Sequence, residues 1–305
     1  MTFLRTFAAA LCALGLGATV STATALADDI VLDSPGSITG IAWDGDVREI
    51  LVTDADGSIT ARAAESGDER SVPFLGEVES VQALSLFDDL LYVGDVGDER
   101  GEREFVTVFR IDPHTEITTF RAWDFTYPDG ARDARAMALS GKGRIYIVTA
   151  GDDPGIYRSV LQPSRTENNE LMRVADAPNG VSDAVFLDDG VTLMLRTGKG
   201  VELIDASDWN ERAATTYADG VDGESITTFG EGRMLVGDAS LLRDEPLPEG
   251  MTTVTPGASV APTAENPETS ESTEATPAPD GSRPSAVSRT GTIVALVVAA
   301  AVAVA

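Results

Sequence analysis

The segment from Ser80 to Asp95 has the sequence SVQALSLFDDLLYVGD and carries the pattern of a β-hairpin. Two apolar-rich runs, 80–86 and 90–95, flank the polar pair Asp88-Asp89, and such turns between short apolar runs are typical of hairpins. The same unit recurs along the chain. Its other copies, each with an Asp- or Gly-containing turn, are residues 37–54, 133–149, 182–196 and 223–238. This recurrence predicts a repeat architecture.

Further strands are predicted after most of these hairpins. Third strands are expected at 58–61, 105–111, 155–158 and 200–204, and fourth strands at 119–125 and 213–217. The units follow one another at about 40 to 50 residues, which is the period of a propeller blade. Four-stranded sheets stacked radially can bury the faces that single hairpins leave exposed. We therefore predict an all-β fold, a single five-bladed β-propeller.

Two alternatives remain open at this point. Periodicity alone does not exclude a β-sandwich. The count would be six blades if the strand at Ile30–Leu32 formed a separate blade with the C-terminal end of the domain. We expect instead that this strand completes the fifth blade.

Composition divides the chain into four parts. Residues 1–27 are predicted to be a signal peptide, because Arg5 precedes an apolar stretch and Ala25-Leu26-Ala27 forms a cleavage site; an uncleaved membrane anchor is the alternative. Residues 28–248 form the propeller domain. We thus expect secretion across the cytoplasmic membrane and an extracellular or cell-surface location.

The C-terminal parts have different compositions. Residues 249–289 are rich in Pro, Thr, Ser and Glu, which predicts a disordered linker. This composition fits an O-glycosylated stalk and an unmodified spacer equally well. Residues 290–305 are apolar and are slightly shorter than a usual spanning helix. We predict that this tail tethers the protein to a membrane or envelope.

Charge and the rarer residue types exclude several classes of function. The formal net charge is −28, from 50 acidic and 22 basic residues. It argues against nucleic acid and anionic membrane surfaces as partners. The only cysteine, Cys12, lies in the predicted signal peptide, so the mature chain has no disulfide. His114 is the only histidine, which excludes a Ser-His-Asp triad and the usual zinc sites.

The repeat places equivalent residues in two rings around the predicted channel. One ring starts the inner strands and contains Thr39, Gln82, Asp133, Asp183 and Glu224; the other ends the second strands and contains Asp54, Asp95, Thr149, Arg196 and Asp238. Carboxylates that converge in this way can bind a hard cation such as Ca²⁺. The candidate metal ligands are Asp95, Asp98, Asp133 and Glu224, and Asp54, Arg196 and Asp238 are expected to line the channel or its mouth. Asp residues at strand ends also commonly cap turns.

The segment 94–103 has the densest charge, with the sequence GDVGDERGER. It has the oxygen-rich composition of a cation-binding loop but lacks the spacing of an EF-hand. Arg100 and Arg103 could instead pair with its acidic residues. The sequence therefore leaves a cation site and a structural ion network equally open.

Several motifs carry a resemblance to a known family. They are GDVGDE (94–99), Arg103, VTVFR (106–110), YPDG (127–130), DARA (133–136), IYIVT (145–149) and GESI (223–226). With them the chain resembles a family of secreted, largely uncharacterised actinobacterial β-propeller proteins over residues 36–240, which implies the same fold. Glu99 stands where family members usually have Asn, and Arg135 replaces their Glu. If that Glu is a metal ligand or general acid in the family, this chain lacks the group.

These observations lead to three functional hypotheses. The first is a surface-displayed, non-enzymatic propeller that binds an extracellular ligand, protein or glycan. The second is a metal-assisted hydrolase of an ester, lactone or phosphate, in which Asp95, Asp98, Asp133 and Glu224 hold a cation that activates water. A fold-level likeness to calcium-using lactonases and phytase-like propellers supports it only by analogy. The third is a glycosidase with paired carboxylates. Three carboxylates in one coordination sphere would favour the second hypothesis, and carboxylates matched by arginines would favour the first.

Overall fold

The computed structural model describes residues 29–32, 37–218, 224–238 and 241–254. The predicted signal peptide, most of the predicted linker and the apolar tail lie outside these residues. All regular secondary structure in the described ranges is β-strand, and the strands form five sheets. Among the described residues, there is no helix that is long and apolar enough to cross a membrane.

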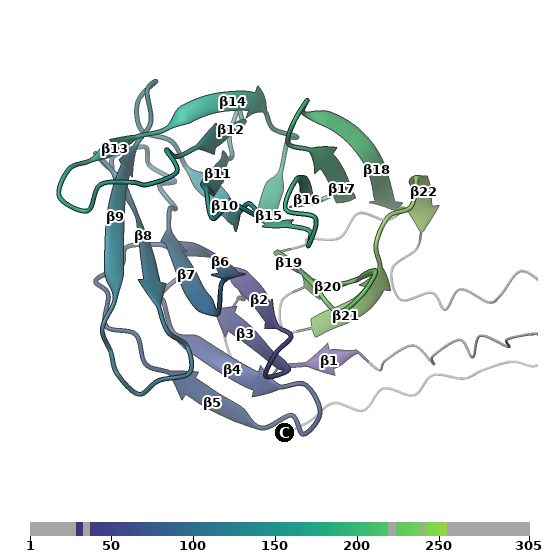
Figure 1. The fold of residues 1–305 in the computed structure, drawn as a ribbon. Coiled ribbons are helices and arrows are strands. Elements are labelled where there is room, and N and C mark those ends of the chain that lie inside the picture. Colours follow the sequence, from purple (N-terminus) through teal and green to yellow (C-terminus); the bar gives the residue numbers. More distant parts are fainter. Residues whose placement is uncertain (1–28, 33–36, 219–223, 239–240, 255–305) are drawn as a thin grey trace, which may run out of the picture. The chain divides into compact units, whose positions relative to one another are not determined.

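The five sheets are the blades of a β-propeller (Figure 1). Blade 1 contains β2 (Gly40–Asp44), β3 (Glu49–Thr53), β4 (Ile59–Ala63) and β5 (Glu69–Val72). Blade 2 contains β6 (Val81–Phe87), β7 (Leu90–Asp95), β8 (Val106–Ile111), β9 (Arg121–Thr126) and β13 (Asn169–Glu170). Blade 3 contains β10 (Ala134–Leu139), β11 (Ile145–Thr149), β12 (Gly155–Arg158) and β14 (Met172–Asp176).

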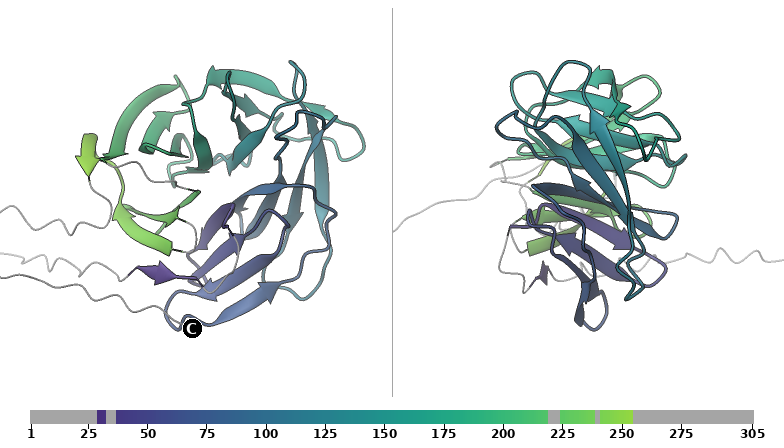
Figure 2. Two further views of the ribbon diagram at one scale, coloured as in Figure 1. Left: turned by 180° about the vertical axis from the view of Figure 1, so that it is seen from behind. Right: turned by 90° about the vertical axis from the view of Figure 1, so that its left-hand side faces the viewer.

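The last two blades close the ring. Blade 4 contains β15 (Val181–Phe186), β16 (Thr192–Thr197), β17 (Gly200–Asp205), β18 (Asn210–Tyr217) and β22 (Met251–Val254). Blade 5 contains β19 (Ser225–Thr228), β20 (Arg233–Asp238), β21 (Leu241–Pro246) and β1 (Ile30–Val31). The first strand of each hairpin, namely β2, β6, β10, β15 and β19, lies innermost, and the same ring is seen from behind in Figure 2. The prediction of five blades is confirmed.

The hairpin of blade 2 shows why these segments fold as they do. Phe87 of β6 pairs with Leu90 of β7, so the turn contains only Asp88 and Asp89. Both turn residues have positive φ angles, 52° and 58°. Such turns match the right-handed twist of the flanking strands, and Asp is among the residues that tolerate them. The polar pair in the sequence therefore sets both the turn and the register.

The N-terminal strand closes the ring by joining the last blade. Ile30 and Val31 of β1 pair antiparallel with Leu242 and Leu241 of β21. This confirms the expectation that the segment beginning at Ile30 completes the fifth blade. Strands from both ends of the domain thus share one sheet.

The described fold extends beyond residue 248, where the sequence analysis ended the domain. Strand β22 pairs in parallel with the outer edge of β18, with Ala214 beside Met251 and Tyr217 beside Val254. The backbone N–H of Ala214 donates to Gly250 O at 3.0 Å, and that of Ala218 donates to Val254 O at 2.8 Å. These bonds occupy backbone groups that an outermost strand would otherwise leave unpaired.

The core lies between neighbouring blades. One cluster combines Val108 and Trp123 of blade 2 with Met137 and Tyr157 of blade 3. Polar contacts also join adjacent blades: the Ile226 amide donates to Asp183 Oδ2 at 2.9 Å, for example. Each blade therefore buries its apolar side chains against the next one, which fixes the inner strands around the central channel.

Candidate functional site

The strand registers define two ends of the channel. Val81 at the start of β6 pairs with Asp95 at the end of β7, whereas the β6–β7 turn lies at the opposite end of the hairpin. The other blades repeat this antiparallel arrangement. We call the end that carries the starts of the inner strands the loop end, and the end that carries the turns after these strands the hairpin end. All the residues predicted as metal ligands or channel residues lie in or beside the loop end.

At the loop end, Asp95 is buried and fully engaged. Its Oδ2 accepts a hydrogen bond from Arg103 Nη2 at 2.6 Å, and its Oδ1 accepts bonds from the backbone amides of Glu79 and Ser80 at 3.0 and 2.6 Å. Arg103 also donates to the carbonyl oxygens of Asp95 and Gly97. The Asp95 carboxylate thus organises the loop that follows β7.

Asp98 and Asp133 are linked to the same loop. Asp98 accepts bonds from the amides of Glu102 and Arg103, both at 3.0 Å, and its own amide donates to Asp133 Oδ1 at 2.8 Å. Asp133 Oδ2 accepts from Arg135 Nε at 2.9 Å. Sequence reasoning placed these acidic residues together, and the structure brings Asp95, Asp98 and Asp133 into one network.

Arg135 connects this network to Glu99. Its Nη2 lies 2.7 Å from Glu99 Oε1. The hydrogen bond and charge of Arg135 lower the pKa of Glu99. Two arginines therefore match the carboxylates of Asp95, Asp133 and Glu99, which is the arrangement expected for a structural ion network.

The remaining predicted residues lie outside this ion network. Glu224 precedes β19 in blade 5, and its Oε2 is buried with no hydrogen-bond partner in the described structure. Asp54 caps its own turn by accepting from the amides of Asp56 and Ser58. Arg196 has no exposed surface and donates to the carbonyl oxygens of Thr197 and Gly200, so it does not face an open mouth. Asp238 ends β20, but its side chain lies outside what is described.

Within the described residues, no group of three His, Cys, Asp or Glu side chains is arranged to hold a metal ion.

Asp183 of the inner ring is completely buried and accepts hydrogen bonds from the backbone amides of Ala184 and Ile226. Burial raises the pKa of its carboxyl well above the usual value. Asp183 thus links blades 4 and 5 and does not reach the channel surface.

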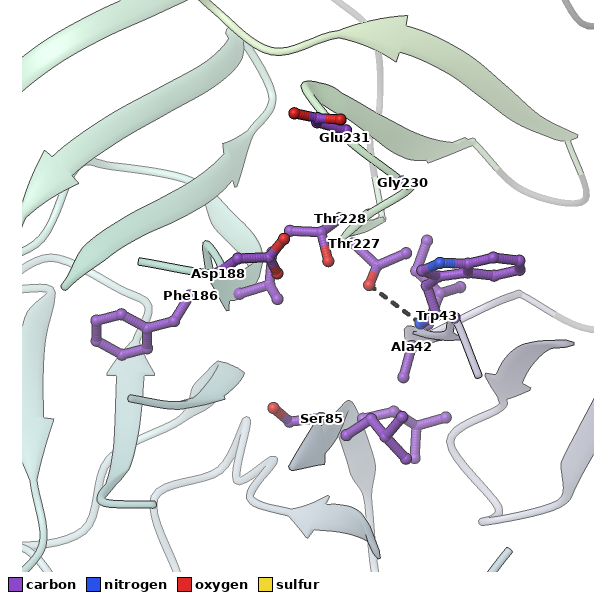
Figure 3. Close-up of a pocket in the computed structure, with 14 residues that line it drawn as sticks. Ala42, Trp43, Ser85, Phe186, Asp188, Thr227, Thr228, Gly230 and Glu231 are labelled. Atoms are coloured by element: carbon purple, nitrogen blue, oxygen red, sulfur yellow. Dashed lines mark hydrogen bonds between the residues drawn. The ribbon is translucent and has the colours of Figure 1, made fainter. Parts of the chain in front are cut away.

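The hairpin end contains a cavity that the sequence analysis did not identify. Its volume is about 640 Å³, within the usual range for small-molecule sites. Inner strands β2, β6, β15 and β19 supply its wall, and the turns after β2, β15 and β19 supply its rim. Figure 3 shows the side-chain oxygens of Ser85, Asp188 and Thr228 directed toward the central space, while the rings of Trp43 and Phe186 point away.

The hydroxyl groups of the wall differ in how they are engaged. Thr227 Oγ1 accepts a bond from the Trp43 amide at 3.2 Å, which leaves its hydroxyl proton available for another acceptor. Ser85 is only 5% exposed, and its hydroxyl makes no hydrogen bond within the described structure. The oxygen itself is accessible from the cavity, so the Ser85 hydroxyl can donate to and accept from water or a ligand there.

The carboxylates of the rim are not neutralised by arginine or lysine. Asp188 follows β15 and Glu231 follows β19, and both are exposed. Neither side chain forms an ion pair or a hydrogen bond with any other described residue. The two ends of the channel thus differ: arginines pair with Asp95, Asp133 and Glu99 at the loop end, whereas Asp188 and Glu231 at the hairpin end have no such partner among the described residues.

The sequence contained only a weak signal for this cavity. Acidic residues occur in the turns after several inner strands, but in the sequence they indicate only hairpin turns. Deciding whether Ser85 or Thr227 lines the channel requires the pleat of each strand and the packing of five blades. Neither is visible in a single hairpin.

Comparisons with known proteins add similarity of fold alone. No family model and no curated protein matches the chain. Among solved structures, a gluconolactonase from Xanthomonas campestris is similar at 15% identity and a TM-score of 0.48, over 71% of this chain and 88% of that chain. A chain of a nidogen/laminin complex is similar at 15% identity and a TM-score of 0.47, over 67% and 73%. The resemblance to the actinobacterial family stays a prediction.

Proposed function

We propose that the propeller is a ligand-binding module that takes a small polar molecule into the cavity at its hairpin end. The observation that carries this proposal is the combination of an open cavity of about 640 Å³ with a wall residue, Ser85, that is only 5% exposed and whose hydroxyl has no hydrogen-bond partner among the described residues. The unpaired carboxylates of Asp188 and Glu231 add polar groups at its rim. Concave sites with a few convergent polar groups are typical of small-molecule binding.

The loop end supports the same conclusion by contrast. A cation approaching Asp95 would have to displace Arg103, whose Nη2 lies 2.6 Å from the carboxylate and whose side chain is only 9% exposed. Separating such a pair leaves one charge buried without compensation. The loop-end network is therefore better suited to holding the loop than to exchanging ligands.

The proposed location of this activity is outside the cell. The signal-peptide features of residues 1–27 support export, and the apolar residues 290–305 support a membrane or envelope tether. A tethered propeller would present its cavity to extracellular ligands. The partner under this proposal is a small extracellular molecule, rather than nucleic acid.

The alternative function is metal-assisted hydrolysis of an extracellular ester, lactone or phosphate. One observation favours it: Glu224 Oε2 is buried without a hydrogen-bond partner, and a bound Ca²⁺ would satisfy it. Asp95, Asp98 and Asp133 would then have to give up bonds that they make in the ion network. This rearrangement is the main cost of the alternative.

Thermal unfolding of the intact chain separates the two functions. The protein is first treated with EDTA and then given Ca²⁺, Mg²⁺ or Mn²⁺. A specific site filled to 100 times its Kd stabilises the fold by about 2.7 kcal/mol. We expect no such shift; a shift that is lost in Glu224→Gln would support the hydrolase and overturn the binding proposal.

A screen of small polar molecules by the same method tests the binding proposal directly. We expect at least one compound to raise the unfolding temperature, with the effect lost in Asp188→Asn. Asp89→Asn is the matched control, because Asp89 is an exposed acidic turn residue of blade 2 that does not line the cavity. Equal shifts in both variants would place the ligand elsewhere.

A further inference from the structure

We infer that the ligand of the hairpin-end cavity is a small hydroxylated amine, held by its ammonium group at the rim and by its hydroxyl groups at the wall. This inference rests on the proposed function and specifies its ligand. It combines three independent features: the charge of the rim, the hydrogen-bonding state of the wall, and the charge of the whole chain.

The rim selects for positive charge. Asp188 and Glu231 lie on the turns of neighbouring blades 4 and 5, and neither has an ionic partner in the described part of the chain. Arg233, which begins β20, is bound to Asp244 and is not among the residues that line the cavity. A ligand ammonium would therefore meet two carboxylates with no competing guanidinium. Hydrogen bonds between charged partners are about twice as strong as neutral ones.

The wall selects for hydroxyl groups. Ser85 Oγ can both donate and accept, whereas Thr227 Oγ1 already accepts from the Trp43 amide and keeps its proton to donate. Thr228 adds a third hydroxyl that faces the central space in Figure 3. A polyol can supply both donors and acceptors to this set. A purely apolar ligand would desolvate these groups without replacing their hydrogen bonds.

The net charge of the protein supports the same ligand class. At −28, the chain attracts cations and repels anions at long range. An anionic sugar acid would meet both this field and the carboxylates of Asp188 and Glu231. Ile41, Leu84 and Val185 are also among the residues that line the cavity.

Three probes of one scaffold test this inference: glucosamine, N-acetylglucosamine and glucuronate. Their binding to the intact chain is measured by ligand-observed NMR at low ionic strength. We expect glucosamine to bind at least tenfold more tightly than N-acetylglucosamine, and glucuronate not to bind. Because the rim is exposed, raising the salt concentration should weaken glucosamine binding.

Variants locate the contacts. The double variant Asp188→Asn/Glu231→Gln should remove most of the preference for glucosamine, and Asp89→Asn should leave it unchanged. Ser85→Ala should weaken glucosamine and N-acetylglucosamine by a similar factor, because it removes a hydroxyl contact. Asp188 and Glu231 are exposed turn residues, and unfolding temperatures verify that each variant is folded.

The outcomes separate this inference from the proposed function. Equal affinity for glucosamine and N-acetylglucosamine, dependent on Ser85, would overturn the amine selectivity and leave the binding proposal intact. Binding of an unrelated polar compound from the screen, with none of the three probes bound, would do the same. If no compound binds in a manner that depends on Ser85 or Asp188, both proposals fail.

Discussion

Arg103 and Asp95 form a buried ion pair at the loop end of the channel, with Arg103 Nη2 2.6 Å from Asp95 Oδ2. Their side chains are 9% and 3% exposed, so water does little to screen the interaction. Arg103 also holds two backbone carbonyls of the same loop. This pair converts an acidic segment that resembles a cation-binding loop into a self-contained structural element.

Replacing Arg103 with leucine should therefore destabilise the fold strongly. Removing one partner of a buried pair typically costs about 3–5 kcal/mol, because the remaining charge has no compensation. Urea unfolding measures the loss. Arg48→Leu is the control, since Arg48 and its partner Glu65 are 60% and 79% exposed and such pairs contribute about 1 kcal/mol or less. Similar losses in the two variants would contradict the structural role of Arg103.

The buried carboxyl of Asp183 should make the stability of the fold depend on pH. Burial raises its pKa above the usual value of 3.8. A carboxyl with a raised pKa contributes stability that is fully present below the unfolded pKa and is lost as the pH rises through the folded pKa. The free energy of unfolding, measured from about pH 4 upward, should fall relative to that of Asp183→Asn.

Asp183→Asn has one hydrogen-bond acceptor fewer than the protein with Asp183. This loss gives a constant offset between the two plots of unfolding free energy against pH. The offset has no pH dependence, so the slope of the difference carries the test. A difference that stays flat across the range would show that Asp183 does not change its protonation on folding. A difference that rises with pH would reverse the sign of the effect.

The strands that sequence reasoning identified share one property: they are apolar runs beside a recognisable turn. Strands β5, β13, β14, β21 and β22 are not among the predicted strands. Strand β22 has the sequence MTTV and precedes a Pro/Thr-rich stretch, and β14 has the sequence MRVAD with no fully buried residue. Their position is set by the unpaired edge of a neighbouring strand, and a single sequence does not display that edge.

The candidate sites, like the strands, include features that the sequence indicates and features that it does not. The repeat placed Asp95 and Asp133 at one end of the channel, because the end of a second strand lies beside the start of an inner strand, and the structure links both of them to Asp98 in one network. It left open whether Arg103 neutralised them, since that depends on the path of the loop 94–103. The cavity lined by Ser85 was not predicted, because it depends on the space left between the inner strands of four blades, β2, β6, β15 and β19.

Strand β22 should stabilise blade 4 although it lies outside the predicted domain. A chain that ends at Pro248 should be less stable than one that ends at Val254 by about 1–3 kcal/mol, since it loses the β18–β22 pairing and the burial of Val254 against the blade 4 core. Hydrogen exchange provides a local readout. The amides of Ala214 and Ala218 should lose protection, while those of inner strand β15 should keep theirs. Unchanged protection at Ala214 would show that β22 does not pair in solution.

Gly200 should be the least replaceable glycine of blade 4. Its φ angle is 152°, and a Cβ atom added there would lie 1.9 Å from the carbonyl oxygen of Thr215 on the paired strand. Gly200→Ala therefore forces β17 away from β18, and overpacking of this kind costs about 1–3 kcal/mol or more. Gly198→Ala is the matched control two residues earlier, where an added Cβ meets no atom within 4 Å. Thermal unfolding of both variants should show a loss only for Gly200→Ala, and equal midpoints would contradict the close approach of β17 and β18.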